Sequence, residues 1–404
     1  MKHAASRPVV RGISELDVRG KRILVREDLN VPLADGVVAD DTRILAALPT
    51  LRNLSQRGAK VIVMSHVGRP DGKVVESLRM APVVTALAHA LQREVKSAPD
   101  CVGPAAHAAV SGLADGDVLL LENLRFHPEE EANDDGFARQ LASLGDAYVN
   151  DAFGTAHRAH ASTAGITKYL PSYMGPLIER ELDVLDEILQ RPKRPFVAVL
   201  GGAKISDKIG VVTRLLELCD AILIGGGMAN TLLAAEGFNV GKSLRDKDLT
   251  PAKQIVEQID RKATKVEVLL PEDAVVAREL SPDAASRFAD VDEISPDEMI
   301  LDIGPTTAEN YRLAILNAKT VLWNGPMGVF EMDAFAAGTE AVGQAIADSG
   351  AMSVVGGGDS AAAARKLGFA DKMTHISTGG GATLEYIEGK ELPGVAALRD
   401  RAPA

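Results

Sequence analysis

Two lysines four residues apart follow a buried strand and a pair of glycines in the middle of the chain. Phe196–Leu200 is a short apolar run rich in valine, which indicates a buried parallel strand. Gly201 and Gly202 follow, and a backbone without Cβ atoms lets a ligand approach closely. If a helix began directly after these glycines, Lys204 and Lys208 would share one face of its first turn. Ammonium groups beside the free N–H groups of a helix N-terminus suit a phosphate, whereas the alternative is an ordinary turn with two solvated lysines.

Cationic side chains gather at predicted strand ends and helix starts in the first half of the chain. They are Arg43, His66, Arg69, Arg125, His157 and Arg158. A single arginine at such a place is usually solvated or half of an ion pair, but several at one sheet edge would repel one another without an anion. Asp28 and Asn30 add acceptors for hydroxyl groups. We therefore expect a small, multiply anionic hydroxy acid phosphate here, and we do not expect the histidines to hold a metal.

Glycine loops follow the strands predicted in the second half. The three triple-glycine loops are Gly225–Gly227, Gly356–Gly358 and Gly379–Gly381. Any one of them could be a plain turn, but three in one sheet, beside Gly201, favour a cradle for a nucleotide. The second loop leads into a predicted helix with Asp359 or Ser360 as its N-cap.

Two familiar nucleotide fingerprints do not match. Gly237–Ser243 resembles a Walker A loop, but Glu236 stands where the first glycine belongs and the segment follows a predicted helix. None of the triple glycines forms a first-strand G-x-G-x-x-G with an acidic residue about 20 positions later. This weakens the prediction of a dinucleotide-dependent oxidoreductase.

Strands alternate with helices along both halves, which is typical of parallel sheets with ligands bound beyond the carboxyl ends of the strands. We predict an α/β protein with two Rossmann-like lobes, each a mostly parallel sheet covered by helices on both faces, joined by a hinge helix. Turn-forming residues before an amphipathic segment indicate where one lobe ends and the connecting helix begins. These are an N-terminal lobe at 1–176, a connecting hinge helix at 177–192, a C-terminal nucleotide-binding lobe at 193–388 and a tail at 389–404.

The composition excludes several classes of protein. The 404 residues are 46% apolar and 25% charged, which is ordinary for a soluble globular protein. A formal charge of −12 argues against nonspecific nucleic-acid binding. The two cysteines, Cys101 and Cys219, are too few and too far apart for a disulfide framework or a cysteine metal site. Without a signal peptide or an apolar run long enough for a bilayer, we expect a cytoplasmic protein with no membrane partner.

The motifs of the chain, in order and over nearly its whole length, resemble those of phosphoglycerate kinase. The matching segments are Val25–Pro32, Asp41–Arg43, Ser65–Pro70, Glu122–Phe126, Asp151–Arg158, Gly201–Lys204 with Lys208, Leu322–Pro326, Gly356–Asp359 and Ser377–Gly381. Departures are small: Leu29 replaces the commoner Phe, Glu27 a commoner apolar or small residue, and Ser360 the commoner Thr. Glu27 adds a negative charge beside an anion site, although it alternates to the other face from Asp28.

The resemblance implies reversible transfer of the acyl phosphate of 1,3-bisphosphoglycerate to ADP in glycolysis, with Mg²⁺. It also implies a two-lobed monomer that closes about a hinge, with its C-terminal tail returning to the N-terminal lobe. By motif, 3-phosphoglycerate would be bound by Asp28, Asn30, Arg43, His66, Arg69, Arg125 and Arg158. The nucleotide would be bound by Gly201, Lys204, Lys208, Asn324, Glu331, Gly357, Gly358, Asp359 and Ser360, with Asp359 near the metal.

No general base is needed, because the acceptor carboxylate is already ionised at neutral pH. Catalysis is then positioning and charge stabilisation of the transferring group. The residues expected to supply it are Arg43, Lys204, Lys208 and the helix N-termini at Gly357 and Gly380. The alternatives are a nucleotide-dependent oxidoreductase, and a noncatalytic sugar-phosphate-binding protein that would have no use for Lys208 or the glycine loops.

Overall fold

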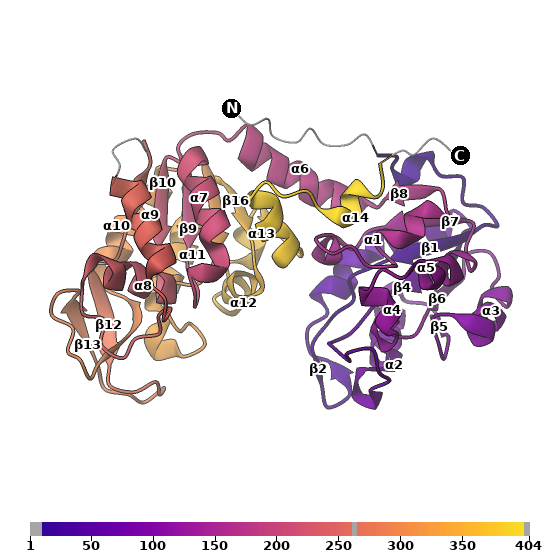
Figure 1. Ribbon diagram of the computed structural model, residues 1–404, viewed down its shortest axis with the longest axis horizontal. Helices are drawn as coiled ribbons and strands as arrows, with labels where there is room; N and C mark the ends of the chain where they lie inside the picture. Colours follow the sequence, from indigo (N-terminus) through magenta and orange to yellow (C-terminus); the bar gives the residue numbers. More distant parts are fainter. Residues whose placement is uncertain (1–9, 261–264, 400–404) are drawn as a thin grey trace. The chain divides into compact units, whose positions relative to one another are not determined.

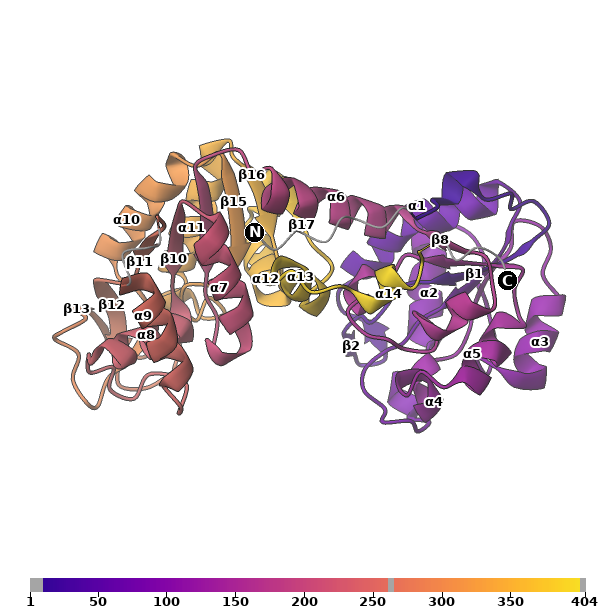
Figure 2. The same cartoon turned by 45° about the horizontal axis from the view of Figure 1, so that its top comes forward.

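The computed structural model describes residues 10–260 and 265–399, and contacts divide them into two compact units (Figures 1 and 2). Unit 1 runs to Asp183 and includes the segment from Glu391 onward, whereas unit 2 runs from Val184 to Lys390. Helix α6 (Pro176–Gln190) begins in unit 1 and ends in unit 2.

Unit 1 is built on a six-stranded sheet in the order β5-β6-β4-β1-β7-β8, with every neighbouring pair parallel. Its strands are β1 (Arg22–Arg26), β4 (Lys60–Met64), β5 (Lys96–Ser97), β6 (Val118–Leu120), β7 (Ala147–Asn150) and β8 (Ser172–Met174). A short antiparallel hairpin, β2 (Leu33–Ala34) and β3 (Val37–Val38), follows β1. Successive residues of β1 are buried whichever way they point, so both faces of the sheet are covered.

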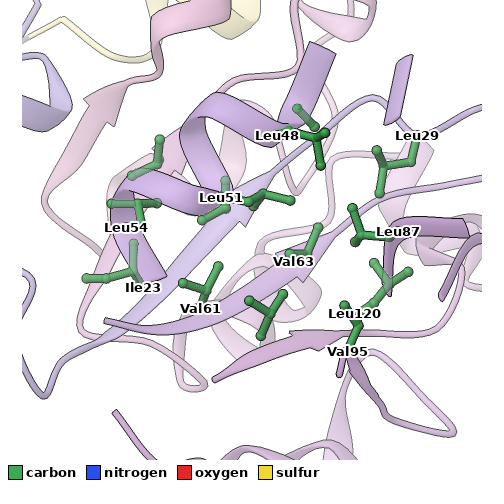
Figure 3. Close-up of a cluster of buried hydrophobic side chains, with 14 of the residues drawn as sticks. Ile23, Leu29, Leu48, Leu51, Leu54, Val61, Val63, Leu87, Val95 and Leu120 are labelled. Carbon is green, nitrogen blue, oxygen red and sulfur yellow. The ribbon is translucent and has the colours of Figure 1, made fainter. Parts of the chain in front are cut away.

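The helices of unit 1 are set by apolar stripes that pack on this sheet. Apart from α6 they are α1 (Thr42–Gln56), α2 (Ala81–Leu91), α3 (Gly103–Ser111), α4 (Pro128–Glu131), α5 (Asp135–Ala142) and α14 (Pro393–Ala396). Figure 3 shows Leu51 and Leu54 of α1 over Ile23 and Val61 of the sheet, in one buried cluster. Helix α2 ends at Leu91, because Gln92 takes a left-handed conformation (φ 57°).

Unit 2 repeats the plan with a parallel sheet in the order β11-β10-β9-β15-β16-β17. Its strands are β9 (Phe196–Leu200), β10 (Ala221–Ile224), β11 (Glu267–Leu269), β15 (Thr320–Asn324), β16 (Met352–Val355) and β17 (His375–Ile376). The predicted pair of parallel sheets is therefore confirmed. A second, antiparallel sheet in the order β13-β12-β14 was not predicted; its strands are β12 (Asp273–Ala277), β13 (Ser286–Asp290) and β14 (Met299–Ile303).

The helices of unit 2 cover its parallel sheet. They are α7 (Ile209–Leu218), α8 (Gly226–Glu236), α9 (Thr250–Asp260), α10 (Pro305–Leu316), α11 (Ala337–Ser349), α12 (Gly358–Lys366) and α13 (Gly381–Ile387). Helices α10, α11 and α12 share one buried cluster with β9 and β15, and α7 lies beside α13 (Figure 2). Short 3-10 turns complete the two units: Ile13–Glu15, Glu76–Leu78, Leu124–Phe126, Phe153–Thr155, Gly165–Lys168, Ser206–Lys208, Asp333–Phe335 and Ala370–Lys372.

Of the two alternatives considered after Gly202, a helix or a turn, the structure has no helix directly after the glycines. A loop and a 3-10 turn precede α7, which begins only at Ile209, so Lys204 and Lys208 do not share a face of its first turn. Gly202 has a left-handed backbone (φ 99°), and Asp246 accepts a hydrogen bond from the backbone N–H of Ser206 at 3.0 Å. These contacts hold the segment as a loop.

The segment after Glu391 packs within unit 1. The backbone N–H of Gly394 donates to the carbonyl oxygen of Ala156 at 2.8 Å, and Asn150 Nδ2 donates to the carbonyl oxygen of Gly394 at 3.2 Å. Both partners follow or end β7, at the edge of the sheet that carries the predicted arginines. Among the described residues, helices with the length and apolar character of a bilayer crossing are absent.

Candidate functional site

In each parallel sheet, the order in which the chain adds strands reverses beside the first strand. In unit 1 the chain runs from β1 to β4 on one side and later places β7 on the other; in unit 2, β10 and β15 flank β9 in the same way. Ligands of open α/β sheets bind at such switch points, beyond the carboxyl ends of the strands. The loops after β1 and β9 are therefore the first places to look for a site.

In unit 1, Arg43 ties the start of α1 to the loop after β1. Its Nη1 lies 2.8 Å from Asp28 Oδ1 and donates to the carbonyl oxygen of Asn30 at 3.1 Å. Asp28 is nearly buried, whereas the Arg43 side chain is 31% exposed. The ion pair fixes one end of the guanidinium and leaves part of it open to a ligand.

Gly68 joins two more loops to this edge. Its backbone N–H donates to Asn30 Oδ1 at 2.9 Å, and its carbonyl oxygen accepts from Arg125 Nη1 at 3.1 Å. Arg125 is only 6% exposed, and its Nε lies 3.2 Å from Glu131 Oε1. The loops after β1, β4 and β6 are thus interlocked, which preorganises the charged groups that they carry.

His66 is buried within this cluster of cations. Its Nδ1 lies 3.1 Å from Arg26 Nη2. Burial, followed by the positive charges of Arg26 and Arg125, lowers the pKa of His66 well below its usual value. The imidazole is therefore neutral at pH 7, and because Arg26 can only donate, Nδ1 is the acceptor and Nε2 carries the proton.

Arg26 was missed in the sequence, where it is the last residue of an apolar strand. It is fully buried, and its Nε donates to Ser162 Oγ at 2.9 Å; that hydroxyl in turn donates to Glu130 Oε1 at 2.5 Å. A cation at the carboxyl end of a buried strand was the available signal, because Arg is rarely fully buried unless it is partnered.

Arg158 and Arg69 complete the predicted set in different ways. Arg158 is half-buried, and its Nε donates to His157 Nε2 at 3.2 Å. It is close enough to contribute, after burial, Arg125 and Arg26, to lowering the pKa of His160 to about 3. Arg69 is exposed, and within the described residues it makes no hydrogen bond or ion pair. The structure thus brings Arg43, His66, Arg125 and Arg158 together and leaves Arg69 unengaged on the loop after β4.

Glu27 lies beneath this edge and has an unusual environment. Its side chain is 1% exposed, and neither carboxylate oxygen has a hydrogen-bond partner among the described residues. Burial and then the neighbouring charge of Asp151 raise the pKa of Glu27 well above its usual value. This environment therefore disfavours the extra negative charge expected beside the anion site.

In unit 2, Lys208 bridges the ends of β9 and β15. Its Nζ donates to the carbonyl oxygens of Gly201 at 2.8 Å and Asn324 at 3.1 Å. Burial lowers the pKa of Lys208 to about 8, although the carboxylates of Asp359 and Asp207 oppose the shift. The ammonium group thus lies at the switch point of the sheet, and the loop carries it there without the predicted helix.

The backbones after β9, β15 and β16 approach closely at this point. A Cβ on Gly201 would overlap the carbonyl oxygen of Pro326, so only glycine fits. Asn324 Nδ2 donates to the carbonyl oxygen of Gly356 at 2.7 Å, and the N–H of Gly325 donates to Ser360 Oγ at 2.5 Å. Asn324 Oδ1 is buried and has no partner among the described residues.

The expected side-chain cap of α12 was wrong. Gly357, with a left-handed backbone (φ 92°), is the N-cap, and no side chain caps the helix. Ser360 uses its hydroxyl for the contact to Gly325 instead. The first turn therefore keeps N–H groups available to an anion.

The remaining predicted residues of unit 2 are exposed, apart from the half-buried Gly380. Gly358 and Asp359 lie in the first turn of α12, and within the described residues Asp359 has no hydrogen bond or ion pair. Gly380 is the N-cap of α13. Lys204 is exposed on the loop after β9, and Glu331 is exposed on the loop after β15.

One further cluster could in principle hold a metal. Ligand atoms of Asp100, Cys101 and His127 lie within 4.8 Å of one another. However, Asp100 Oδ1 is already 2.8 Å from His127 Nε2, and burial raises the pKa of the Cys101 thiol well above its usual value. A protonated thiol is a poor ligand, so this cluster is not part of the candidate site.

The sequence is similar to one family over nearly its whole length. A family model described as phosphoglycerate kinase matches residues 13–390. A phosphoglycerate kinase of Moorella thermoacetica is 56% identical over 390 residues, which cover 96% of this chain and 99% of the relative. One from Pelotomaculum thermopropionicum is 54% identical over 390 residues, with the same coverage.

Solved structures show the same likeness. The phosphoglycerate kinase of Coxiella burnetii superposes with a TM-score of 0.85 at 41% identity, covering 96% of this chain and 99% of that one. That of Pyrococcus horikoshii gives a TM-score of 0.85 at 36% identity, covering 96% and 98%.

Proposed function

The chain belongs to the phosphoglycerate kinase family, and we propose that unit 1 binds 3-phosphoglycerate while unit 2 binds the nucleotide. The enzyme reversibly transfers a phosphoryl group from 1,3-bisphosphoglycerate to ADP, giving 3-phosphoglycerate and ATP in glycolysis. The observation that carries the division is the contrast between the two switch points. One is lined by arginine and histidine side chains, and the other by glycine backbone and a half-buried lysine.

The cluster in unit 1 suits a substrate with a carboxylate, a hydroxyl and a phosphate. Arg43, Arg125 and Arg158 offer guanidinium groups that bind such anions bidentately, and Arg69 is free to join them. Neutral His66 presents an N–H at Nε2, and Asp28 and Asn30 provide acceptors for the hydroxyl. Arg69 makes no ion pair within the described residues and Arg43 remains 31% exposed, which supports an anionic ligand here.

The nucleotide site would use backbone groups and one ammonium. Gly357 and Gly358 expose N–H groups at the start of α12, and Lys208 lies at the switch point close to Asp359. Gly201, Asn324 and Ser360 would shape the floor of the site, since they hold the three loops together. Glu331, on the loop after β15, would accept hydrogen bonds from hydroxyl groups of the nucleotide.

Asp359 fits a role at Mg²⁺. It is an exposed carboxylate without a partner among the described residues, next to the N–H groups proposed to hold phosphates. Magnesium is usually held by one or two carboxylates together with substrate phosphates. When bound, the ion would neutralise charge on the phosphates of ATP or ADP.

The chemistry calls for charge stabilisation rather than proton transfer. The acceptor in the ATP-consuming direction is a carboxylate, which is ionised at neutral pH. Lys208 and Arg43 would stabilise the transferring phosphoryl group, together with the helix N-termini at Gly357 and Gly380. Lys204 would assist from the same loop as Lys208.

We further propose that the enzyme acts as a cytoplasmic monomer whose lobes close about the hinge at residues 177–192. One chain carries the residues proposed to bind both 3-phosphoglycerate and the nucleotide, so a second chain is not needed to complete the site. Closure would bring the two ligands together and exclude water. The two buried, free cysteines suit a reducing compartment, and the charge of −12 argues against nucleic acid as a partner.

A crossed binding experiment tests the division of the ligands. ATP formation from 1,3-bisphosphoglycerate and ADP would first be measured for the intact enzyme. Calorimetry would then compare Arg125→Ala and Asp359→Ala: the first should weaken 3-phosphoglycerate alone, and the second should weaken Mg²⁺-ATP alone. If Arg125→Ala weakened the nucleotide instead, the proposed division would be wrong.

A further inference from the structure

Lys366, in the last turn of α12, uses all three of its N–H donors on one neighbouring loop. Its Nζ donates to the carbonyl oxygens of Phe330 at 3.0 Å and Glu331 at 2.9 Å, and to Asp333 Oδ1 at 3.0 Å. An ammonium group has three donors and no acceptor, so its hydrogen-bonding capacity is filled. The loop that carries Glu331 is thereby fastened to α12.

The loop from Phe330 to Phe335 is buried at both ends and exposed to solvent between them. Phe330 and Phe335 are buried, at 5% and 0% exposure, whereas Glu331 and Asp333 between them are exposed. Within the described residues, the Glu331 carboxylate makes no hydrogen bond or ion pair. Lys366 therefore fixes the backbone of Glu331 and leaves its carboxylate available.

The same helix carries the proposed phosphate end of the nucleotide site. Gly358 and Asp359 lie in the first turn of α12, and Lys366 is its last residue. A nine-residue helix has a rise of about 1.5 Å per residue, so its two ends are about 12 Å apart. This length is comparable to a nucleotide, and α12 with Lys366 thus links the groups expected to meet its two ends.

We propose that Lys366 is a positioning residue for nucleotide binding, which holds Glu331 at a set place relative to the first turn of α12. The proposal rests on the nucleotide role of Glu331 and Asp359 given above. Lys366 touches no substrate itself and acts only through the loop.

A purely structural role for Lys366 predicts a different outcome. The Lys366 side chain is 39% exposed and that of Asp333 is 95% exposed. Exposed ion pairs of this kind contribute little to stability. The loss of Lys366 should consequently disturb the placement of Glu331 more than it disturbs the fold, and nucleotide affinity is the quantity that separates the two roles.

The test compares Lys366→Met with Lys366→Arg and a matched control. Methionine keeps an unbranched chain but removes the charge and the donors, and arginine keeps both. Lys372→Met removes a nearby exposed lysine that lies over the Phe369 ring. We expect K366M to raise KM for ATP about tenfold, with kcat and KM for 3-phosphoglycerate within about twofold of wild type. K366R should recover most of the affinity, and K372M should leave it unchanged.

A double variant decides whether Lys366 acts through Glu331. If it does, K366M should add nothing to the rise in KM for ATP caused by Glu331→Ala. An unchanged KM in K366M, or effects that multiply in the double variant, would overturn the inference while the nucleotide role of Glu331 stands. If E331A leaves KM for ATP at the wild-type value, both the role of Glu331 and the inference fail. Should K366M not fold, K366Q, which keeps a donor, is measured in the same way.

Discussion

Arg26 Nη2 lies 3.1 Å from Nδ1 of His66, inside a cluster where neither side chain meets solvent. Because a guanidinium only donates, this contact sets the tautomer of the imidazole as well as its charge. The histidine is neutral with its proton on Nε2, although it lies among cations. The resulting pH behaviour is open to direct measurement.

Substrate affinity should not follow a histidine titration near pH 6.5. Burial and the charges of Arg26 and Arg125 keep the pKa of His66 well below its usual value, so its protonation state is constant from pH 6 to 8. We expect KM for 3-phosphoglycerate to lack an inflection from this residue across that range. In Arg26→Met, the pKa of His66 should rise, and its Cε1–H proton signal in NMR should begin to titrate.

The result that would contradict this assignment is a titration of the His66 signal between pH 6 and 7 in the wild-type enzyme. His89, which is exposed on α2, provides the matched reference signal, and His89→Gln identifies it.

Replacing Glu27 should stabilise the protein at alkaline pH. The carboxyl is buried without a partner, and its pKa in the folded protein is raised. An acid of this kind binds its proton more tightly in the folded state, so its unfavourable contribution grows as pH rises above the unfolded value near 4.5. Glu27→Val should therefore increase the free energy of unfolding by about 1–3 kcal/mol at pH 8, and by less at pH 5.

Urea denaturation at the two pH values measures this difference, with Glu129→Val as an exposed control from the same unit. Equal gains at pH 5 and pH 8, or a loss at pH 8, would show that the Glu27 carboxyl has a partner or is ionised in the folded enzyme.

Nucleotide affinity should fall above pH 8. Burial lowers the pKa of Lys208 to about 8 in the free enzyme, so the ammonium loses its proton as pH rises through that value. The neutral amine no longer attracts phosphate, and the free enzyme competent for ATP declines by up to about tenfold per pH unit. We expect KM for ATP to rise from pH 8 to 9 while KM for 3-phosphoglycerate stays level. If KM for ATP did not change between pH 8 and 9 in the wild-type enzyme, and behaved in the same way in Lys208→Arg, this titration would be ruled out.

Binding of both ligands should compact the enzyme. If unit 1 holds 3-phosphoglycerate and unit 2 holds the nucleotide, the two ligands must meet for transfer, and we propose that they do so by closure about α6. Small-angle scattering should give a smaller radius of gyration with both ligands bound than with either one alone. An unchanged radius under saturating conditions would count against closure.

Much of the architecture could be predicted because buried parallel strands are marked by apolar runs that end in glycine or polar residues. Phe196–Leu200 is predicted and observed with the same bounds. The antiparallel sheet was harder to see, because β13 is mostly exposed and its one buried residue, Ala289, gives no apolar alternation.

The details of the site depend on contacts between residues far apart in the sequence. The start of α7 could not be placed from the sequence, because Lys208 bonds to Asn324 on another strand and helix propensity does not contain that contact. Ser360 was expected as a possible cap, but its hydroxyl contacts Gly325 instead. Arg26 was missed because its network with Ser162 joins residues far apart in the sequence. Local patterns predict which groups reach the sheet edge, and tertiary contacts decide how each is held.

We propose that charge positioned at the two switch points, by Lys208 in unit 2 and Arg43 in unit 1, accelerates phosphoryl transfer. Turnover of Lys208→Ala and Arg43→Ala under saturating substrates tests it most directly, with Lys372→Ala as the control. We predict that kcat falls by roughly two to three orders of magnitude in each variant, as for the loss of one preorganised donor, and that the control is unchanged. A kcat within a few-fold of wild type in either variant would contradict the claim and remove that residue from the mechanism.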